Sequence, residues 1–135
     1  MAVRATETIA PLHVSVRGEP AQLRVLRGAL RLWLLRAEVP AEVAWDVLTA
    51  CSEACTNAVA HAYRHQPEPG TVELDARWTR SGTLVCHVRD SGRWRPALDE
   101  RPGGGGLSLM CSLMDKVEVR RSPGGTVVRM SRRMT

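Results

Sequence analysis

The chain has 135 residues, of which 44% are apolar, and its aromatic residues are 4 Trp, 1 Tyr and no Phe. These values indicate one globular domain with a core of Leu, Val, Ala and Met, and they argue against disorder. The net charge is +5, no run of 18 apolar residues occurs, and the first residues lack the apolar segment of a signal peptide, so we expect a cytoplasmic protein without membrane contact.

The positive charge lies at one end of the sequence. Residues 1–119 are neutral overall, and residues 120–135 have no acid and five arginines, Arg120, Arg121, Arg129, Arg132 and Arg133. A nucleic-acid-binding domain needs a basic face across the domain. We therefore expect no direct contact with nucleic acid, and we expect a basic C-terminal end at 129–135.

One strand and two helices are predicted in the first half. Residues 12–16 alternate apolar and polar, which is typical of a half-buried strand. Apolar residues recur at helical spacing over 21–37, and a second helical pattern runs from Pro40 to Tyr63. The first helix also gathers basic side chains on another face, which is either solvated or a docking surface for an acidic partner: Arg24, Arg27 and Arg31.

The second half predicts two hairpins separated by a loop and a helix. Strands alternate around a Ser81-Gly82 turn, and Asp90 to Gly106 has the composition of a functional loop. A helix over 107–114 precedes a second hairpin, which turns at 122–125. This order predicts an α+β sandwich in which one mixed, mainly antiparallel sheet is covered on one face by helices.

The four cysteines, Cys51, Cys55, Cys86 and Cys111, form no C-x-x-C pair. We expect buried, reduced thiols. No histidine pair has the spacing of a zinc finger, so a zinc site is not expected.

A polar stripe interrupts the second helix. Glu53, Asn57 and His61 are spaced four residues apart, so they share one face, and their neighbours are mostly Ala, Cys and Val. The stripe either faces solvent or forms a metal-phosphate site. In such a site Asn would supply an oxygen ligand to Mg²⁺, and Glu would act on a nucleophile as a base.

Two further motifs have nucleotide-binding character. Asp90-Ser91-Gly92 ends a strand, where Asp can accept a hydrogen bond from an amine, although the tripeptide alone is typical of a turn. A glycine run, 103–106, opens a helix whose first amides have no internal partner and suit phosphate oxygens, although such a run is often a linker. It is neither a Walker A loop nor a Rossmann fingerprint.

Together these motifs resemble the N, G1 and G2 boxes of the gyrase, Hsp90, histidine-kinase and MutL (GHKL) ATPase superfamily. The segment Glu53 to Tyr63, with its Ala-x-x-His-Ala-Tyr tail, resembles the bacterial anti-sigma-factor serine/threonine kinases in particular. The resemblance covers about residues 10–132 and implies a single histidine-kinase-like ATPase domain over 1–135, with the Bergerat fold.

The resemblance implies a role for each matching residue. Glu53 would be the catalytic base, and Asn57 would bind the Mg²⁺ that bridges the ATP phosphates. Asp90 would read the adenine amine, assisted by Gly92 and by Thr126. The phosphates would be lined by the amides of Gly104, Gly105, Gly106, Leu107 and Ser108.

The sequence departs from the family pattern at the G1 box. Trp94 stands where a second glycine is usual, and the implied ATP lid, 94–103, is short. Trp94 would stack on the nucleotide, cap the lid or restrict it. His61 matches the motif without an assigned chemical role, and three arginines of this loop are either phosphate contacts or exposed loop charges: Arg93, Arg95 and Arg101.

The resemblance implies a regulator that is also an enzyme. Such a protein would transfer the γ-phosphate of ATP to Ser or Thr of a STAS-type anti-sigma-factor antagonist and sequester a sigma factor. It would also form a homodimer, as related kinases do. The alternative is an ATP-binding interaction module without phosphotransfer. A nucleic-acid binder that uses the C-terminal arginines is the least favoured hypothesis.

Overall fold

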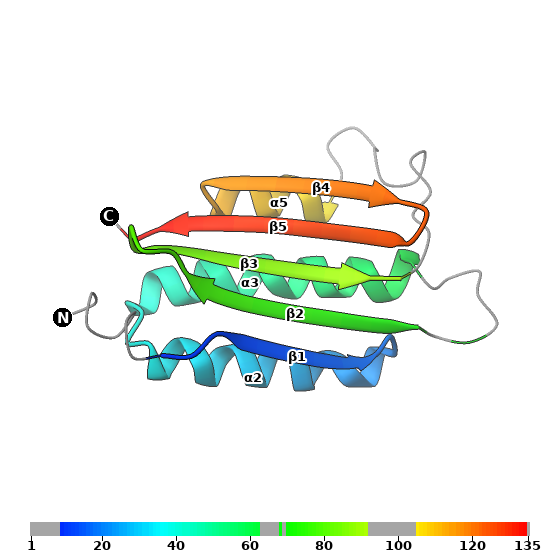
Figure 1. The fold of residues 1–135 in the computed structure, drawn as a ribbon, viewed down its shortest axis with the longest axis horizontal. Helices are drawn as coiled ribbons and strands as arrows, with labels where there is room; N and C mark the ends of the chain where they lie inside the picture. Colours follow the sequence, from blue (N-terminus) through cyan, green and yellow to red (C-terminus); the bar gives the residue numbers. More distant parts are fainter. Residues whose placement is uncertain (1–8, 63–67, 69, 92–104, 135) are drawn as a thin grey trace.

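The computed structural model describes residues 9–62, 68, 70–91 and 105–134 (Figure 1). Elements keep the labels of Figure 1. Their order is β1 (Leu12–Arg17), the 3-10 turn η1 (Pro20–Gln22), α2 (Leu23–Arg36), α3 (Ala41–Asn57), the π-helical turn η2 (Ala58–Ala62), β2 (Thr71–Trp78), β3 (Thr83–Asp90), α5 (Gly105–Leu113), β4 (Lys116–Ser122) and β5 (Gly125–Arg133).

The five strands form one sheet in the order β1-β2-β3-β5-β4. Every pair among these strands is antiparallel, whereas a mixed, mainly antiparallel sheet was predicted. After α5, β4 runs in the same direction as β3, so direct pairing of these two strands would have been parallel. Since β5 lies between them, both contacts are antiparallel. The predicted α+β architecture is confirmed.

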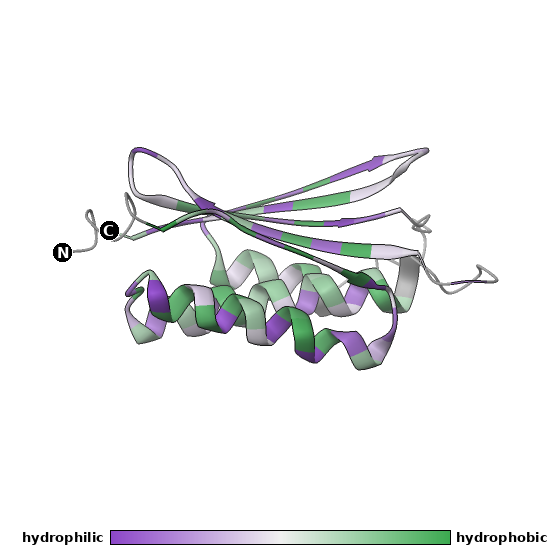
Figure 2. Cartoon of the chain, turned by 60° about the horizontal axis from the view of Figure 1, so that its bottom comes forward, coloured by the Kyte–Doolittle hydropathy of each residue, from purple (hydrophilic) through white to green (hydrophobic). Residues whose placement is uncertain are grey.

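The helices lie on one face of the sheet (Figure 2). Alternation in β2 turns Val72, Leu74 and Ala76 toward the helices, where they are buried, and turns Glu73 and Asp75 to the opposite face. Among the described residues, the buried core contains no Phe or Tyr and consists mainly of aliphatic side chains, three thiols and Met110, Met114 and Met130. The composition predicted this kind of core.

Trp33 of α2 ties the helix layer to the strands. Its ring stacks on Trp78 of β2 with 6.1 Å between the ring centroids. Its indole Nε1 donates a hydrogen bond of 2.8 Å to the carbonyl oxygen of Ala10, just before β1. The buried indole therefore finds an acceptor, as buried Trp usually does, and the bond fixes where β1 begins relative to α2.

The element boundaries differ from the predicted ones chiefly in the second helix. Its α-helical part ends at Asn57, and the wider turn η2 follows, whereas the periodicity predicted one helix to Tyr63. The first turn of α5 begins at Gly105, two residues before the predicted start. The Ser81-Gly82 turn is confirmed, with Gly82 at φ +84°.

The C-terminal arginines belong to the sheet. Arg129, Arg132 and Arg133 lie in β5, which runs three residues beyond the predicted strand end. Each one pairs with an acid, at nitrogen-to-oxygen distances of 3.2 Å to Glu118, 2.7 Å to Asp46 and 3.8 Å to Asp115. The positive charge predicted for 129–135 is therefore compensated locally at three arginines.

Candidate functional site

One end of the molecule collects the segments that carry the three motifs. Figure 1 places the C-terminal end of α3 with η2, the C-terminal end of β3, the turn between β4 and β5, and the start of α5 at the same end. α3 packs against α5 and β3. Residues that are separated by up to about half of the sequence therefore meet at one edge of the two-layer sandwich.

Glu53 and Asn57 lie one turn apart on α3, and both are half-buried. Their neighbours Ala54 and Cys55 are buried in the core, which fixes the orientation of this part of the helix. The turn η2 begins directly after Asn57. A π-turn has more residues per turn than an α-helix, so the predicted four-residue stripe does not continue regularly to His61, whose side chain lies outside the described residues.

Asp90 and Thr126 lie opposite each other on the adjacent strands β3 and β5. They are partners in the register of β3 and β5, and they are the two buried polar side chains of the described chain, 8% and 2% exposed. Asp90 is the last residue of β3 and Thr126 is the second residue of β5. The predicted pair therefore meets at the rim of the site.

Gly125 brings the β5 backbone against Asp90. Its φ is +140°, and a Cβ added there would overlap the carbonyl oxygen of Asp90 and come within 2.9 Å of the Asp90 carbonyl carbon and the Cα of Ser91. Only glycine fits this position without displacing the chain. The sequence contained the signal, a Gly directly before Thr126, but its steric reason became visible only in the fold.

The first turn of α5 contains the second half of the glycine motif. Gly105 and Gly106 are its first residues, followed by Leu107 and Ser108, whose side chains are exposed. The first amides of a helix lack internal acceptors, and the helix dipole favours an anion there. This part of the predicted phosphate-binding segment therefore lies at a helix start, as expected.

Several predicted site residues lie outside the described residues. They are Gly92, Gly104, the lid segment 94–103 with Trp94, and the arginines Arg93, Arg95 and Arg101. Within the part of the chain that the structure describes, no group of three or more His, Cys, Asp or Glu side chains is arranged to hold a metal ion. No described helix is long and apolar enough to span a bilayer.

Three cysteines belong to the buried core between the helices and the sheet. Cys51, Cys55 and Cys86 are buried and free, as predicted, but Cys111 is exposed on α5, so the prediction of burial was wrong there. A hydrogen bond with Cys86, followed by burial, raises the pKa of Cys51. Burial raises the pKa of Cys55 to about 12. Thiols protonated at neutral pH are poor nucleophiles, so these residues act as packing groups.

Comparisons with known proteins agree with this geometry. The family model for the histidine kinase-like ATPase domain matches residues 16–132. The serine-protein kinase RsbW of Bacillus pumilus is 32% identical over an alignment 137 positions long. The alignment covers 90% of this chain and 85% of that protein. The anti-sigma F factor of Heyndrickxia coagulans is 31% identical over 99 residues, 64% of this chain and 67% of that protein.

A solved structure shares the fold. The RsbU and RsbW domains of Rv1364c from Mycobacterium tuberculosis superpose with a TM-score of 0.76 at 26% identity, over 92% of this chain. The chain spans about a third of that longer protein, 32%. From its family match, its relatives and its fold, the chain belongs to the histidine kinase-like ATPase domain family.

Proposed function

We propose that the protein binds Mg-ATP and transfers the γ-phosphate to a Ser or Thr hydroxyl of an anti-sigma-factor antagonist, and that it also sequesters a sigma factor. The observation that carries the proposal is the meeting of Glu53, Asn57, the Asp90–Thr126 pair and the start of α5 at one end of a family fold. The names of the relatives, serine-protein kinase RsbW and anti-sigma F factor, support the same function.

The Asp90–Thr126 pair suits the base of a nucleotide. The Asp90 carboxylate can accept a hydrogen bond from the exocyclic amine of adenine, and guanine has a carbonyl oxygen at the equivalent ring position, which a carboxylate repels. Thr126 supplies a hydroxyl that donates and accepts beside it. Strand pairing fixes the backbone of both residues side by side, so the proposed base-reading groups come from a preformed part of the sheet.

The helix ends suit the phosphates. Backbone amides at the start of α5, from Gly105 to Ser108, are available for phosphate oxygens. Asn57 offers a neutral oxygen to Mg²⁺, and magnesium in such sites is held by few protein ligands together with phosphates and water. When bound, Mg²⁺ neutralises charge on the phosphates. A single protein ligand beside a row of amides fits that requirement.

Glu53 is placed to act as the base. It lies one turn before Asn57 and is half-buried at the same edge. Its carboxylate would accept the proton of the attacking hydroxyl while the hydroxyl oxygen bonds to the γ-phosphorus and ADP leaves. The rest of the catalysis is positioning by Asn57 and by α5.

The first test separates binding from transfer. In calorimetry with Mg-ATP, Asn57→Ala should bind about tenfold more weakly or worse, because a ligand to the metal-phosphate unit is lost. With labelled ATP and a STAS-type antagonist domain, Glu53→Gln should retain ATP binding and lose about 10²-fold or more in transfer rate. Matched controls on the same helix are Ser52→Ala and Glu42→Gln, which should behave as wild type.

The outcomes rank the two candidate functions. No ATP binding by the wild-type chain would refute the proposal at its base. Two results together would favour the alternative, an ATP-binding interaction module without phosphotransfer. The wild-type protein would bind ATP without labelling the antagonist, and cells that carry the Glu53→Gln variant would regulate the partner normally. That alternative is supported by the departure at Trp94 from the usual G1 pattern.

The assembly and location are also proposed. The antagonist is of the STAS type, and the protein works as a homodimer in the cytoplasm. Free thiols at Cys51, Cys55 and Cys86 are consistent with a reducing compartment. Sedimentation at several protein concentrations, with and without ATP, measures the oligomeric state, and a concentration-independent monomer would contradict the dimer.

A further inference from the structure

The outer face of α2 carries an apolar stripe that the fold leaves uncovered. The stripe consists of Val25, Gly28, Leu32 and Leu35, which recur on one side of the helix. Val25, Leu32 and Leu35 are 45%, 49% and 66% exposed. A Cβ added at Gly28 would meet no atom within 4 Å. Helix-interior glycine is unfavourable compared with alanine, and here it permits the close approach of another chain.

A row of arginines lies beside this stripe on the side of α3. Arg31 lines a groove together with α3 residues, and the positive charge of Arg27 acts on the buried thiol of Cys55 in α3. α2 contains four arginines and no acid, and none of the four forms an ion pair with another described residue. The outer face of α2 therefore has an apolar stripe with a row of positive charges beside it.

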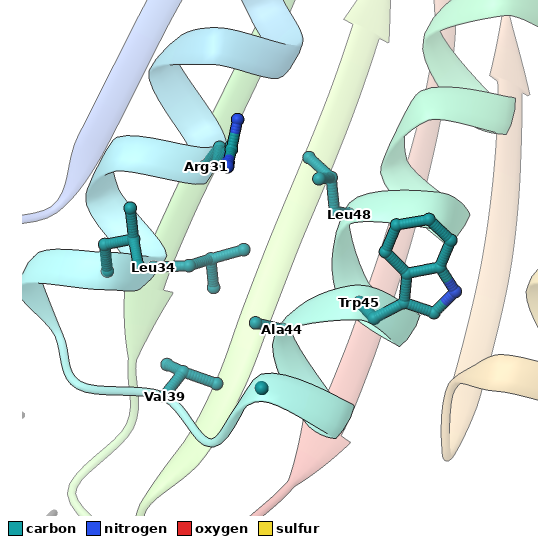
Figure 3. A pocket seen from close by; sticks show the side chains of 8 residues that line it. Arg31, Leu34, Val39, Ala44, Trp45 and Leu48 are labelled. Carbon is teal, nitrogen blue, oxygen red and sulfur yellow. The ribbon is translucent and has the colours of Figure 1, made fainter.

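A groove continues the stripe between α2 and α3. Its volume is 320 Å³, and its surface is mainly apolar, with contributions from Arg31, Leu34, Leu35, Val39, Ala41, Ala44, Trp45 and Leu48. Figure 3 shows α2 residues on one side, Ala44, Trp45 and Leu48 of α3 on the other, and Val39 in the connection. Trp45 is 69% exposed. A solvent-exposed tryptophan beside a concave apolar surface is typical of a binding site for protein side chains.

We infer that the stripe and the groove form a docking surface for an acidic amphipathic helix of a partner protein. An apolar ridge of such a helix fits the stripe, with one large side chain in the groove, and carboxylates on its flank meet Arg24, Arg27 and Arg31. Gly28 lets the two helix backbones approach. This is the i, i+3, i+4, i+7 mode of helix recognition, with charges that set the orientation.

Charge argues against a second copy as the occupant, and the shape of the groove argues against a lipid surface. A second copy of the same face would set four arginines against four arginines, and like charges at an interface are unfavourable. A lipid surface attracts a basic apolar helix, but it contacts protruding side chains and leaves a concave groove unfilled. Glu38 and Glu42 are exposed nearby, but they do not line the groove.

The groove lies away from the nucleotide site, whereas Arg27, nearer the start of α2, acts on Cys55 between Glu53 and Asn57. Figure 1 shows the C-terminal end of α2 and the N-terminal end of α3 at one end of the molecule, and the end of β3 with the β4–β5 turn at the other. Docking at the groove therefore requires neither bound ATP nor Glu53. The inference goes beyond the proposed kinase function and stands or falls separately from it.

The test uses a designed peptide as the probe. A fluorescein-labelled helix of about 18 residues, with Leu on one face and Glu on the flanks, spans α2. Its anisotropy should rise on addition of the full chain without ATP, and added salt should weaken binding. Leu35→Asp, Trp45→Ala and Arg31→Glu should each weaken binding about tenfold. Asn57→Ala should bind the peptide as wild type does, which separates this result from the ATP site.

Matched controls address the peptide and the protein. A peptide with Lys in place of each Glu, and one with the same residues in scrambled order, should bind at least about tenfold more weakly. Leu109→Asp on α5 and Arg80→Glu in the β2–β3 turn change an exposed leucine and an exposed arginine elsewhere and should leave peptide affinity unchanged. Because Trp45 is highly exposed, its replacement keeps the test valid if Leu35→Asp does not fold.

Three results would overturn the inference. One is no binding of the acidic peptide, or binding insensitive to all three surface variants. A second is a wild-type dimer that Leu35→Asp converts to a monomer, which would assign the face to a second copy. The third is variant-sensitive binding to phosphatidylglycerol vesicles with no binding to the peptide, which would assign it to a membrane surface.

Discussion

Gly125 is the residue on which the Asp90–Thr126 pair depends. Its backbone lies against Asp90 in a conformation that favours glycine, at the place where the proposed adenine reader lies. The neighbouring Gly124 has no such role, since an added Cβ would be 3.9 Å from Ser122 Oγ and in ordinary contact. Two adjacent glycines in the same turn therefore differ in what they do.

Replacement of the two glycines should give different results. Gly125→Ala should lower the free energy of unfolding by about 2 kcal/mol or more, because both the φ value and the carbonyl contact become unfavourable. It should also weaken ATP binding through displacement of Asp90. Gly124→Ala should leave both close to wild type. Urea unfolding and ATP calorimetry measure these effects, and equal behaviour of the two variants would show that the close approach is unimportant.

His13 gives the outer sheet face a pH-dependent contribution. Its Nδ1 lies 2.5 Å from Asp75 Oδ1, and this hydrogen bond, with the charge of Asp75, raises the pKa of His13. Because the pKa of His13 is higher in the folded state, the contact stabilises the folded protein fully at pH values below the unfolded-state pKa of about 6.5. This stabilisation is lost as the pH rises through the folded-state pKa. Wild type should therefore exceed His13→Gln in stability more at pH 5.5 than at pH 8.5.

His87 acts in the opposite direction. Burial, and then the charge of Arg89, lowers its pKa, so its contribution is present above the unfolded value and is lost as pH falls. The His13 effect should therefore be read as the difference between wild type and His13→Gln from urea unfolding at each pH, in which the His87 contribution cancels. A difference that does not change with pH would contradict the role of Asp75.

The candidate site residues could be predicted only where a motif contained them. Glu53, Asn57, Asp90 and Thr126 were identified from spacing and resemblance, and the structure brings their segments together. The contact of Gly125 with Asp90 was missed because it joins residues 35 positions apart in sequence. The exposure of Cys111 was also missed, because an apolar pattern does not tell which side of a short helix faces water.

At the scale of elements, α3 shows where periodicity stops being informative. The segment after Asn57 reads Ala-Val-Ala-His-Ala, which favours a regular helix locally, yet it forms η2. π-turns occur frequently at functional sites, and this one follows the proposed metal ligand directly. Nothing in the local pattern marks it.

Arg132 connects three elements at the opposite end from this turn. Its guanidinium donates to Asp46 Oδ2 of α3 at 2.7 Å and to the carbonyl oxygen of Leu113 of α5 at 2.6 Å, from its place in β5. The side chains of Arg132 and Asp46 are about a quarter exposed, 24% and 27%. The pair is therefore partly shielded from water, which makes it stronger than a surface pair.

Loss of this connection should be measurable. Arg132→Ala should lower the free energy of unfolding by about 1–2 kcal/mol, because Asp46 and the Leu113 carbonyl lose their donor. Arg133→Ala is the matched control in the same strand, since that side chain is 70% exposed and its contact with Asp115 is 3.8 Å. The control should change stability by less than about 0.5 kcal/mol. Chemical denaturation at moderate salt distinguishes them, and similar losses would contradict a special role for Arg132.

At the scale of the whole molecule, local patterns predicted the layers but not the order of the strands. Alternation in 72–78 and 84–88 and the helical spacing over 21–37 gave the elements and the face that each buries. The place of β5 between β3 and β4 depends on pairings between distant segments, which no local pattern contains. The groove between α2 and α3 was likewise unpredicted, because it arises from the spacing of two helices.

The place of β5 between β3 and β4 has a consequence for how the chain is made. The strand synthesised last in this sequence is the one that joins β4 to the rest of the sheet, so a growing chain cannot close the sheet until residues through Arg133 have left the ribosome. Until then the edge of β3 offers unpaired backbone groups to other chains. Folding of the sheet therefore awaits a late, long-range pairing, a kind of contact that slows folding and lengthens exposure to aggregation.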